Sequence, residues 1–213
     1  MSLMKESINK IFNQFKIHTQ YSICEGAIKI DQLKNFCKKN KIQSLGLSDT
    51  YNLSGALEFS ENLSAVGTQP IIGTQILFKY KSFYGLIPLI AKNYIGYKNI
   101  IKLSSKSYLE NSETSDPNCN FEDLVNNSEG IIVLTGSIRC MFGKLFNKGL
   151  FNVIEEILIK LKEKFENHIY IEIQRHNDLN EKEFENYNLI LSEKLELPII
   201  ASNEVYYLDK DML

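Results

Sequence analysis

Residues 130–174 read GIIVLTGSIRCMFGKLFNKGLFNVIEEILIKLKEKFENHIYIEIQ, and this stretch decides the fold class. The runs 130–137 and 168–174 are nearly continuously apolar, which is typical of strands buried on both faces of a sheet. Between them, apolar side chains with helical spacing share one face of a predicted helix over 151–165, and we interpret that face as core packing. These side chains are Phe151, Ile154, Leu158, Leu161 and Phe165. A strand, a helix and a second strand in this order predict an α/β fold.

The same alternation continues on both sides of this unit. Asp31 is the candidate N-cap of the first helix. The economical arrangement is a parallel sheet covered by helices, either as a closed barrel or as a doubly wound sheet, and functional residues gather at the carboxyl ends of the strands in both. The polar segment 110–120 is predicted to be a mobile surface loop. Further strands are predicted at 44–49, 70–80, 85–92 and 198–203, and further helices at 30–39, 53–63, 94–108 and 181–196.

Composition and charge exclude several classes of protein. With 213 residues, 44% of them hydrophobic, the chain can bury a large core and is not intrinsically disordered. Its 24 basic and 26 acidic residues leave a net charge of -2, so it lacks the positive field that autonomous DNA binding needs. No apolar run reaches the length of a membrane span and the N-terminus has no signal core, which predicts a cytoplasmic protein without a membrane partner. Four cysteines without a Cys-x-x-Cys pair are predicted to be free thiols.

Several titratable side chains stand at predicted strand ends and could form a site. Neutral imidazoles and carboxylates bind transition metals, and the candidates are His18, Glu25, His176 and Glu204. For His18 alone, a structural hydrogen bond at a strand end is the simpler interpretation. A hydrolytic cluster of two or three metal ions needs more ligands than this set provides. The chain also lacks a nucleophile elbow, a P-loop and the glycine pattern of a dinucleotide-binding turn.

Three stretches resemble a known family in detail. IHTQYSICEGAIKIDQL (17–33), LGLSDTYNLSGALEF (45–59) and QPIIGTQI (69–76) are similar to the start of the PHP domain, the polymerase-and-histidinol-phosphatase domain at the N-terminus of the bacterial replicative DNA polymerase III alpha subunit. Further blocks follow in the family's order at 89–108, 129–137, 170–177 and 197–212.

The resemblance implies a distorted seven-stranded (β/α) barrel of the PHP type over residues 15–213, truncated from a much longer polymerase chain. Residues 1–14 are then a leader and N-terminal extension, of which 1–3 are vector-derived. Asp209 is expected to cap a helix that the chain begins without completing.

In the metal-loaded members of this family, histidine, cysteine and acidic ligands surround a three-metal site, and the resemblance assigns those positions in this chain. His18, Glu25 and Glu204 keep side chains that can bind a metal. At the other positions the expected ligand is replaced. The replacements are Lys16, Thr50 and Tyr206 in place of histidines, Gln75 in place of a glutamate and Ser137 in place of a cysteine.

These replacements argue against a working metal centre. A protonated lysine cannot coordinate a cation, and it places a positive charge where the metals would be. Neutral oxygen donors are too weak to hold zinc or manganese without supporting anions. We therefore expect a vestigial site with no catalytic residue and no metal; if zinc or manganese does bind, its ligands are His18, Glu25 and Glu204. Our hypothesis is that Lys16 fills the vacated cation position and pairs with Glu25 and Glu204.

Two classes of function follow from the resemblance. The first is a structural or partner-binding PHP domain of a polymerase chain, in which this fragment is not itself catalytic and the full chain synthesises DNA. Its partners would be the polymerase body of the same parent chain and the separate proofreading exonuclease subunit. DNA would be contacted only through the full polymerase, and magnesium would bind in the polymerase domain outside this chain.

The alternative is a metal-dependent phosphoesterase or 3′–5′ exonuclease of the PHP superfamily. Bound metal, together with hydrolysis that Glu204→Ala abolishes, would distinguish it from the first class. A free-standing phosphatase of the histidinol-phosphate type would share the fold but not the blocks at 17–59.

Overall fold

The apolar runs form one curled sheet of nine strands in the part of the chain that the structure, a computed structural model, describes, namely residues 13–110 and 116–209. The strand order is β8-β7-β6-β4-β3-β2-β1-β9, and β5 pairs with β3. The strands are β1 (Lys16–Ile17), β2 (Ser44–Thr50), β3 (Gln69–Tyr80), β4 (Phe83–Ala91), β5 (Asn118–Asn120), β6 (Ile131–Leu134), β7 (Ile169–Ile173), β8 (Ile199–Ala201) and β9 (Glu204–Val205). The helices are α1 (Ile30–Asn40), α2 (Ala56–Ser64), α3 (Tyr94–Leu109), α4 (Phe121–Asn126), α5 (Met141–Asn147), α6 (Phe151–Phe165) and α7 (Glu181–Leu195), and a 3₁₀ turn spans Glu166–His168.

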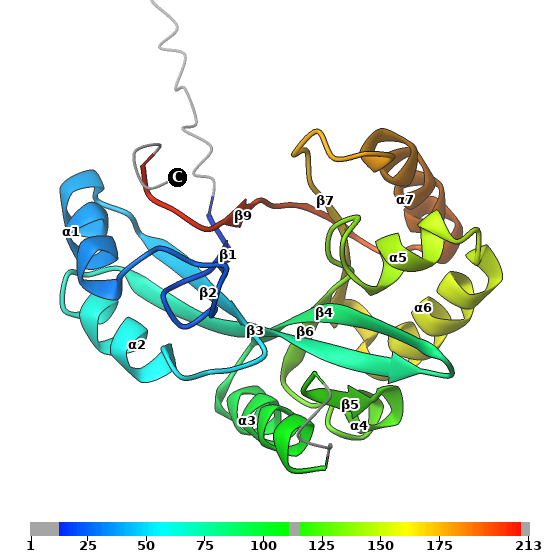
Figure 1. Cartoon of the computed structure of the whole chain (residues 1–213), viewed down its shortest axis with the longest axis horizontal. Helices are drawn as coiled ribbons and strands as arrows, with labels where there is room; N and C mark the ends of the chain where they lie inside the picture. Colours follow the sequence, from blue (N-terminus) through cyan, green and yellow to red (C-terminus); the bar gives the residue numbers. More distant parts are fainter. Residues whose placement is uncertain (1–12, 111–115, 210–213) are drawn as a thin grey trace, which may run out of the picture.

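The two edge strands of this sheet are neighbours in the sequence. β8 and β9 lie at opposite ends of the strand order, yet only Ser202 and Asn203 separate them along the chain. The chain therefore links the two edges directly, and the sheet curls around an interior with the helices on its outer side (Figure 1). The predicted α/β barrel is confirmed. The described residues contain more than seven strands because segments of two or three residues, such as β5 and β9, add to the sheet.

The prediction of a purely parallel sheet is wrong, because β4 runs antiparallel to both of its neighbours, β3 and β6. Lys81 and Ser82 alone connect β3 to β4. So short a connection forms a hairpin, since a parallel return needs a crossover of about a dozen residues or more. Lys81 adopts the left-handed backbone (φ 55°) that tight hairpin turns use. The turn lacks the Asn-Gly or Asp-Gly pair by which such hairpins are recognised in a sequence.

The predicted helices are present, and their ends differ by a few residues at most. The helix expected at 151–165 has those bounds, and the one expected at 53–63 begins at Ala56. Asp31 is not the N-cap of α1, because the helix already begins at Ile30, whose side chain is fully buried in the core.

Part of the predicted loop at 110–120 is a strand. Residues 118–120 form β5, and the buried Cys119 lies opposite Phe78 of β3. The segment 111–115 lies outside the described residues, as do most of the predicted leader (1–12) and the residues after Asp209 on which the final helix was predicted (210–213).

Two hydrophobic clusters pack the outer side of the sheet against the helices. The larger includes Phe78 of β3, Val133 of β6 and Leu158 of α6, and the smaller includes Leu47 of β2 and Phe59 of α2. Because side chains alternate along a strand, residues next to these core positions face the barrel interior. In β1, Ile17 joins the smaller cluster while the adjacent Lys16 and His18 are buried among polar groups. The interior is therefore polar, and it contains the candidate site.

A membrane-spanning role finds no support in the helices that the structure describes, since none combines the length and the apolar character that crossing a bilayer requires.

Candidate functional site

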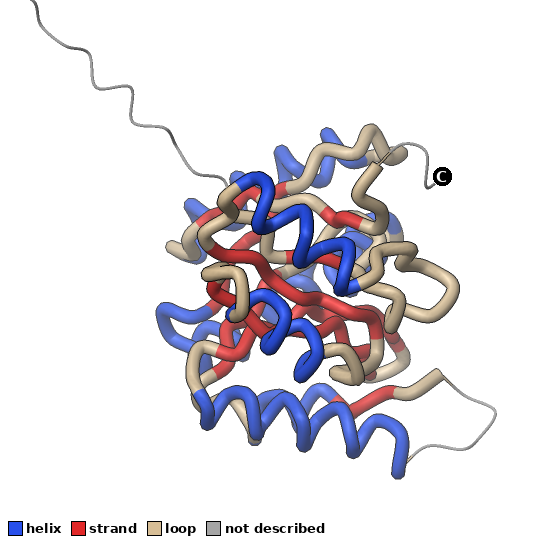
Figure 2. The backbone as a smooth tube through the Cα atoms, turned by 90° about the vertical axis from the view of Figure 1, so that its left-hand side faces the viewer, coloured by secondary structure: helices blue, strands red, loops and turns tan. Residues whose placement is uncertain are grey.

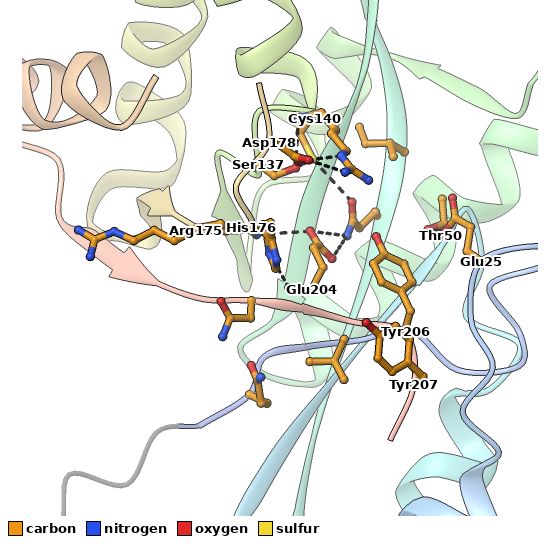
Figure 3. A pocket seen from close by; sticks show the side chains of 17 residues that line it. Glu25, Thr50, Ser137, Cys140, Arg175, His176, Asp178, Glu204, Tyr206 and Tyr207 are labelled. Carbon is orange, nitrogen blue, oxygen red and sulfur yellow. Dashed lines mark hydrogen bonds and ion pairs between the residues drawn. The ribbon is translucent and has the colours of Figure 1, made fainter. Parts of the chain in front are cut away.

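A cavity of about 580 Å³ opens at the interior of the barrel. Its wall includes Thr50 at the carboxyl end of β2, Ser137 just beyond β6 and Gln174 just beyond β7, so the predicted gathering of polar residues at the carboxyl ends of strands is observed. Figure 3 shows Glu204 near the centre of this wall and Glu25, Thr50 and Tyr206 together on one side of it.

Lys16 is the centre of a buried ionic cluster that meets this cavity through Glu204, one of the residues in the cavity wall. Its Nζ atom lies 3.2 Å from Oε1 and 3.3 Å from Oε2 of Glu172, and it forms an ion pair with the carboxylate of Glu204. The side chains of Lys16 and Glu172 are 1% and 0% exposed. Burial alone would lower the pKa of Lys16, but the two carboxylates outweigh it and raise that pKa above its ordinary value of 10.5. Lys16 is therefore an ammonium ion at neutral pH.

Glu204 connects Lys16 to a histidine. Its Oε2 atom lies 2.5 Å from Nε2 of His18 and accepts a hydrogen bond of 3.1 Å from Nε2 of Gln75. Burial would raise the pKa of Glu204, yet Lys16 and His18 hold that pKa well below its ordinary value of 4.5. Because an ionised carboxylate only accepts hydrogen bonds, Nε2 of His18 donates in this contact.

Glu172 is held by neutral donors as well as by Lys16. Nε2 of Gln174 donates to Oε1 of Glu172 over 2.7 Å, and the hydroxyl of Ser202 donates to the same oxygen. Buried charges persist when they are paired and hydrogen-bonded, and Glu172 satisfies both conditions.

The ring of His18 is fixed from two further directions. Tyr206 stacks on it with 4.3 Å between ring centroids and an interplanar angle of 19°. Nδ1 of His18 lies 3.2 Å from Oγ of Ser22, and that hydroxyl donates to Asp49 over 2.8 Å. Tyr206 thus covers the imidazole with an apolar surface at the position where the resemblance expects another histidine.

Glu25 lies apart from the lysine, and in this respect the hypothesis is wrong. Its Oε2 atom accepts a hydrogen bond of 2.6 Å from Oγ1 of Thr50, and no ion pair joins it to Lys16. Ser137 is placed next to Cys140, with 3.6 Å between Oγ and Sγ. The structure thus brings Lys16, His18, Gln75 and Glu204 into one cluster. Thr50 lies at its edge, with its Oγ1 atom 3.5 Å from Nδ1 of His18, while Glu25 and Ser137 lie at other parts of the cavity wall.

His176, the second candidate imidazole, lies at the edge of the network. Its Nε2 atom accepts a hydrogen bond of 3.4 Å from the backbone N–H of Glu204, and its own backbone N–H donates to Glu181. It therefore positions the backbone of β9 and does not contact the lysine cluster through its ring.

Sequence reasoning missed Glu172, although it supplies half of the negative charge around Lys16. The residue is the only acidic one in the apolar strand IYIEI, and it is 1% exposed. A lone carboxylate inside a strand buried on both faces needs a cationic partner, which is the signal that could have found it. Gln174 and Ser202, which complete the environment of Glu172, carry no comparable signal.

The residues present do not fit a cluster of metal ions. Among the described residues, no group of three or more His, Cys, Asp or Glu side chains is arranged to hold a metal. The ammonium of Lys16 pairs with Glu204, one of the carboxylates that would have to act as a ligand, and its charge repels cations. Water activation by a metal cannot be assigned to this arrangement.

Comparisons with known proteins show to which family this curled barrel with its polar interior belongs. The sequence profile of the PHP domain matches residues 14–176, so the chain belongs to the PHP domain family. Its curated relatives include the DNA polymerase III alpha subunits of Borreliella burgdorferi, 32% identical over 96% of this chain, and Rickettsia felis, 33% identical over 94%. The chain spans 19% and 17% of those two proteins.

Solved structures share the fold at low sequence identity. A protein from Bifidobacterium adolescentis, described as a metal-dependent phosphoesterase, has a TM-score of 0.57 and 10% identity, with 94% of this chain and 93% of that one covered. An amidohydrolase from Chromobacterium violaceum, with bound sulfate and no metal, has a TM-score of 0.58 and 8% identity, with 91% and 87% covered. At these identities the likeness establishes the fold alone. The chemistry of the barrel interior has to be inferred from the residues of the site.

Proposed function

We propose that this chain is the PHP domain of a bacterial DNA polymerase III alpha subunit and that its role is structural and partner-binding rather than hydrolytic. The parent chain would carry out template-directed DNA synthesis in the cytoplasm, with magnesium bound in a polymerase domain outside these residues. The support is identity of about one third to such subunits over nearly the whole chain.

The observation that carries the structural role is the position of Lys16. The resemblance places it where metal-loaded relatives have their first histidine ligand, and its ammonium is paired with Glu172 and Glu204. An ammonium ion can hold two buried carboxylates together as a metal does. It cannot lower the pKa of a bound water or polarise a phosphoryl oxygen as a Lewis acid, which hydrolysis of a phosphoester by this superfamily would require.

A structural, partner-binding role also implies which proteins contact this domain. The polymerase body of the parent chain would pack against this domain, and the separate proofreading exonuclease subunit would bind to it. Direct binding of DNA by the domain is disfavoured by its net charge of -2.

Hydrolysis assays separate this function from a metal-dependent phosphoesterase or 3′–5′ exonuclease. The chain, incubated with zinc or manganese, is expected to leave bis(p-nitrophenyl) phosphate and 3′-labelled single-stranded DNA intact. Metal-dependent cleavage that Glu204→Ala abolishes would overturn the structural role. In the full parent polymerase, Lys16→Met is expected to lower the melting temperature and, with it, DNA synthesis at elevated temperature, whereas Lys194→Met, which breaks an exposed pair with Glu155, is expected to change neither.

A further inference from the structure

One face of α3 presents large apolar side chains that residues 13–110 and 116–209 leave partly or largely exposed. Tyr94 is 71% exposed, Tyr108 is 52% exposed and Leu109 is 83% exposed, with Ile95 and Ile101 about two-fifths exposed. The opposite face of the same helix is buried in the larger hydrophobic cluster through Ile100 and Leu103. The helix therefore has apolar side chains on two sides, whereas a surface helix that contacts only the core and water has one apolar face and one polar face.

The exposed residues form a continuous seam. Tyr94, Ile101 and Tyr108 are seven residues apart, so they lie close to one line along the helix over about 21 Å. A repeat of seven residues is the spacing that a second helix contacts when it packs lengthwise. Ser105 lies in the same exposed strip and leaves room for a larger side chain of a partner.

The charge along this seam is positive. Lys98 lies over the Tyr94 ring, with its Nζ atom 5.1 Å from the ring centroid, and neither Lys98 nor Lys102 forms an ion pair with another described residue. Lys106, by contrast, is paired with Asp123 over 2.7 Å and with Glu110 over 3.3 Å. Within the described residues, this face thus has two positive charges without an ion-pair partner, on a chain whose net charge is -2.

The charges discriminate between possible occupants of the seam. A second copy of the chain, packed through the same helix, would bring Lys98 and Lys102 against the lysines of its partner and would be disfavoured by like-charge repulsion. A helix with acidic residues beside its apolar positions would gain ion pairs from both lysines instead.

The location of α3 keeps this seam separate from the barrel cavity. In Figure 1 the helix lies outside the sheet, across the barrel from β9, and Figure 2 shows it as the long helix along the lower edge, with no described element on its outer side. A partner bound to α3 would contact neither the buried Lys16 cluster nor the wall of the cavity.

From these observations we propose that the exposed face of α3, which presents Tyr94, Ile101, Tyr108 and Leu109 together with Lys98 and Lys102, is a docking surface for an acidic amphipathic helix of another protein chain. The apolar residues would contact the hydrophobic face of that helix and the lysines its carboxylates. This inference rests on α3 alone and holds whatever the role of the buried lysine.

A synthetic pair of probes tests it directly. The first is a labelled 21-residue helical peptide with leucine at heptad positions a and d and glutamate at e and g; the second has lysine in place of the glutamates. Fluorescence anisotropy with the 213-residue chain is expected to show saturable binding of the acidic peptide and at least about tenfold weaker binding of the basic one. Exchanging the charges with Lys98→Glu and Lys102→Glu is expected to reverse this preference.

Variants locate the binding on α3. Ile101→Asp is expected to weaken binding of the acidic peptide about tenfold or more, whereas Leu179→Asp, at an equally apolar but distant residue that is 85% exposed, is expected to change nothing. Because Ile101 is partly buried, Ser105→Glu provides a second test: it adds a repelling charge at an exposed position and should weaken binding without affecting the fold, while Ser105→Gln should not.

Four results would overturn the proposal. They are absence of binding, equal binding of both peptides, self-association of the chain in sedimentation that Ile101→Asp abolishes, and co-sedimentation with phosphatidylcholine–phosphatidylglycerol vesicles that Ile101→Asp abolishes while the acidic peptide does not bind. The third would assign the face to a second copy of the chain and the fourth to a lipid surface.

Discussion

Nζ of Lys16 lies 3.2 Å from Oε1 of Glu172, although the two residues are 156 positions apart in the sequence. The contact crosses the barrel from β1 to β7, two strands that are not neighbours in the sheet. Together with Glu204, this pair fixes three strands to one another through the interior, where relatives that bind metals would use ions. The stability of the barrel should therefore depend on Lys16 far more than on any surface ion pair.

Removal of the ammonium group is the first test of this dependence. Lys16→Met leaves Glu172 buried without a cationic partner and Glu204 with His18 alone, and we expect it to reduce the free energy of unfolding by about 3–5 kcal/mol in urea denaturation. The matched control is Lys194→Met, which breaks an exposed pair with Glu155 and should leave the urea midpoint nearly unchanged.

A triple variant separates the buried charge from the loss of packing. If uncompensated carboxylates cause the destabilisation, Lys16→Met combined with Glu172→Gln and Glu204→Gln should be more stable than Lys16→Met alone, because the three sites are coupled. A triple variant that is the least stable of the set would argue that packing, not charge, determines the effect.

The pH dependence of stability should report Glu204. Lys16 and His18 depress the pKa of this carboxyl in the folded chain, so its contribution is complete above the ordinary value of 4.5 and is lost as the pH falls below it. The difference in unfolding free energy between the wild type and Glu204→Gln should therefore be largest at neutral pH and shrink below about pH 4.5. Glu163→Gln, on the outer side of α6, should show no such trend, and a Glu204→Gln difference that stays constant from neutral to acidic pH would refute the ionic role of Glu204.

Tyr206 should act through its ring and not through its hydroxyl. Tyr206→Ala removes the surface stacked on His18 and is expected to lower the free energy of unfolding by about 1 kcal/mol or more, whereas Tyr206→Phe keeps the stack and should resemble the wild type. Proton NMR of the His18 ring gives a local readout, since the loss of an aromatic ring 4.3 Å away changes its chemical shift. Equal effects of the two variants would contradict the stacking role.

Asn93 should be required for a stable start of α3. Its side chain accepts a hydrogen bond of 3.0 Å from the backbone N–H of Gly96, so Asn93→Ala is expected to cost about 1 kcal/mol in thermal or chemical denaturation. Asn93→Ser preserves an oxygen acceptor at the N-cap and should retain most of that stability. A loss as large for serine as for alanine would exclude capping as the cause.

The sequence predicted most of the strands and helices because their apolar patterns are long and regular. The helix at 151–165 was predicted with its observed bounds. The direction of β4 was not, because direction depends on the connection to β3, and the Lys81–Ser82 turn has no glycine or asparagine to mark it. Short strands such as β1 and β9 were also missed, since two residues are too few for any periodicity.

The candidate site could be predicted only in part. The resemblance pointed to Lys16 and Glu204, and the structure places them in contact, but Glu25 pairs with Thr50 instead. Glu172 was missed because it interrupts an apolar strand far along the chain, and its partner becomes evident only when the sheet curls and brings β7 opposite β1. The seam on α3 could not be predicted for a different reason. Apolar residues on both sides of a helix are interpreted as core residues until the fold shows which side other elements cover.

The metal content of the chain, purified without chelators, tests most directly the claim that Lys16 takes the place of metal ions in the barrel. Elemental analysis should find no stoichiometric zinc or manganese, and addition of either ion should leave the melting temperature unchanged, because the ammonium already occupies the position between the carboxylates of Glu172 and Glu204 and pairs with both. Two or three ions per chain, with a melting temperature that rises when they are restored, would contradict the account.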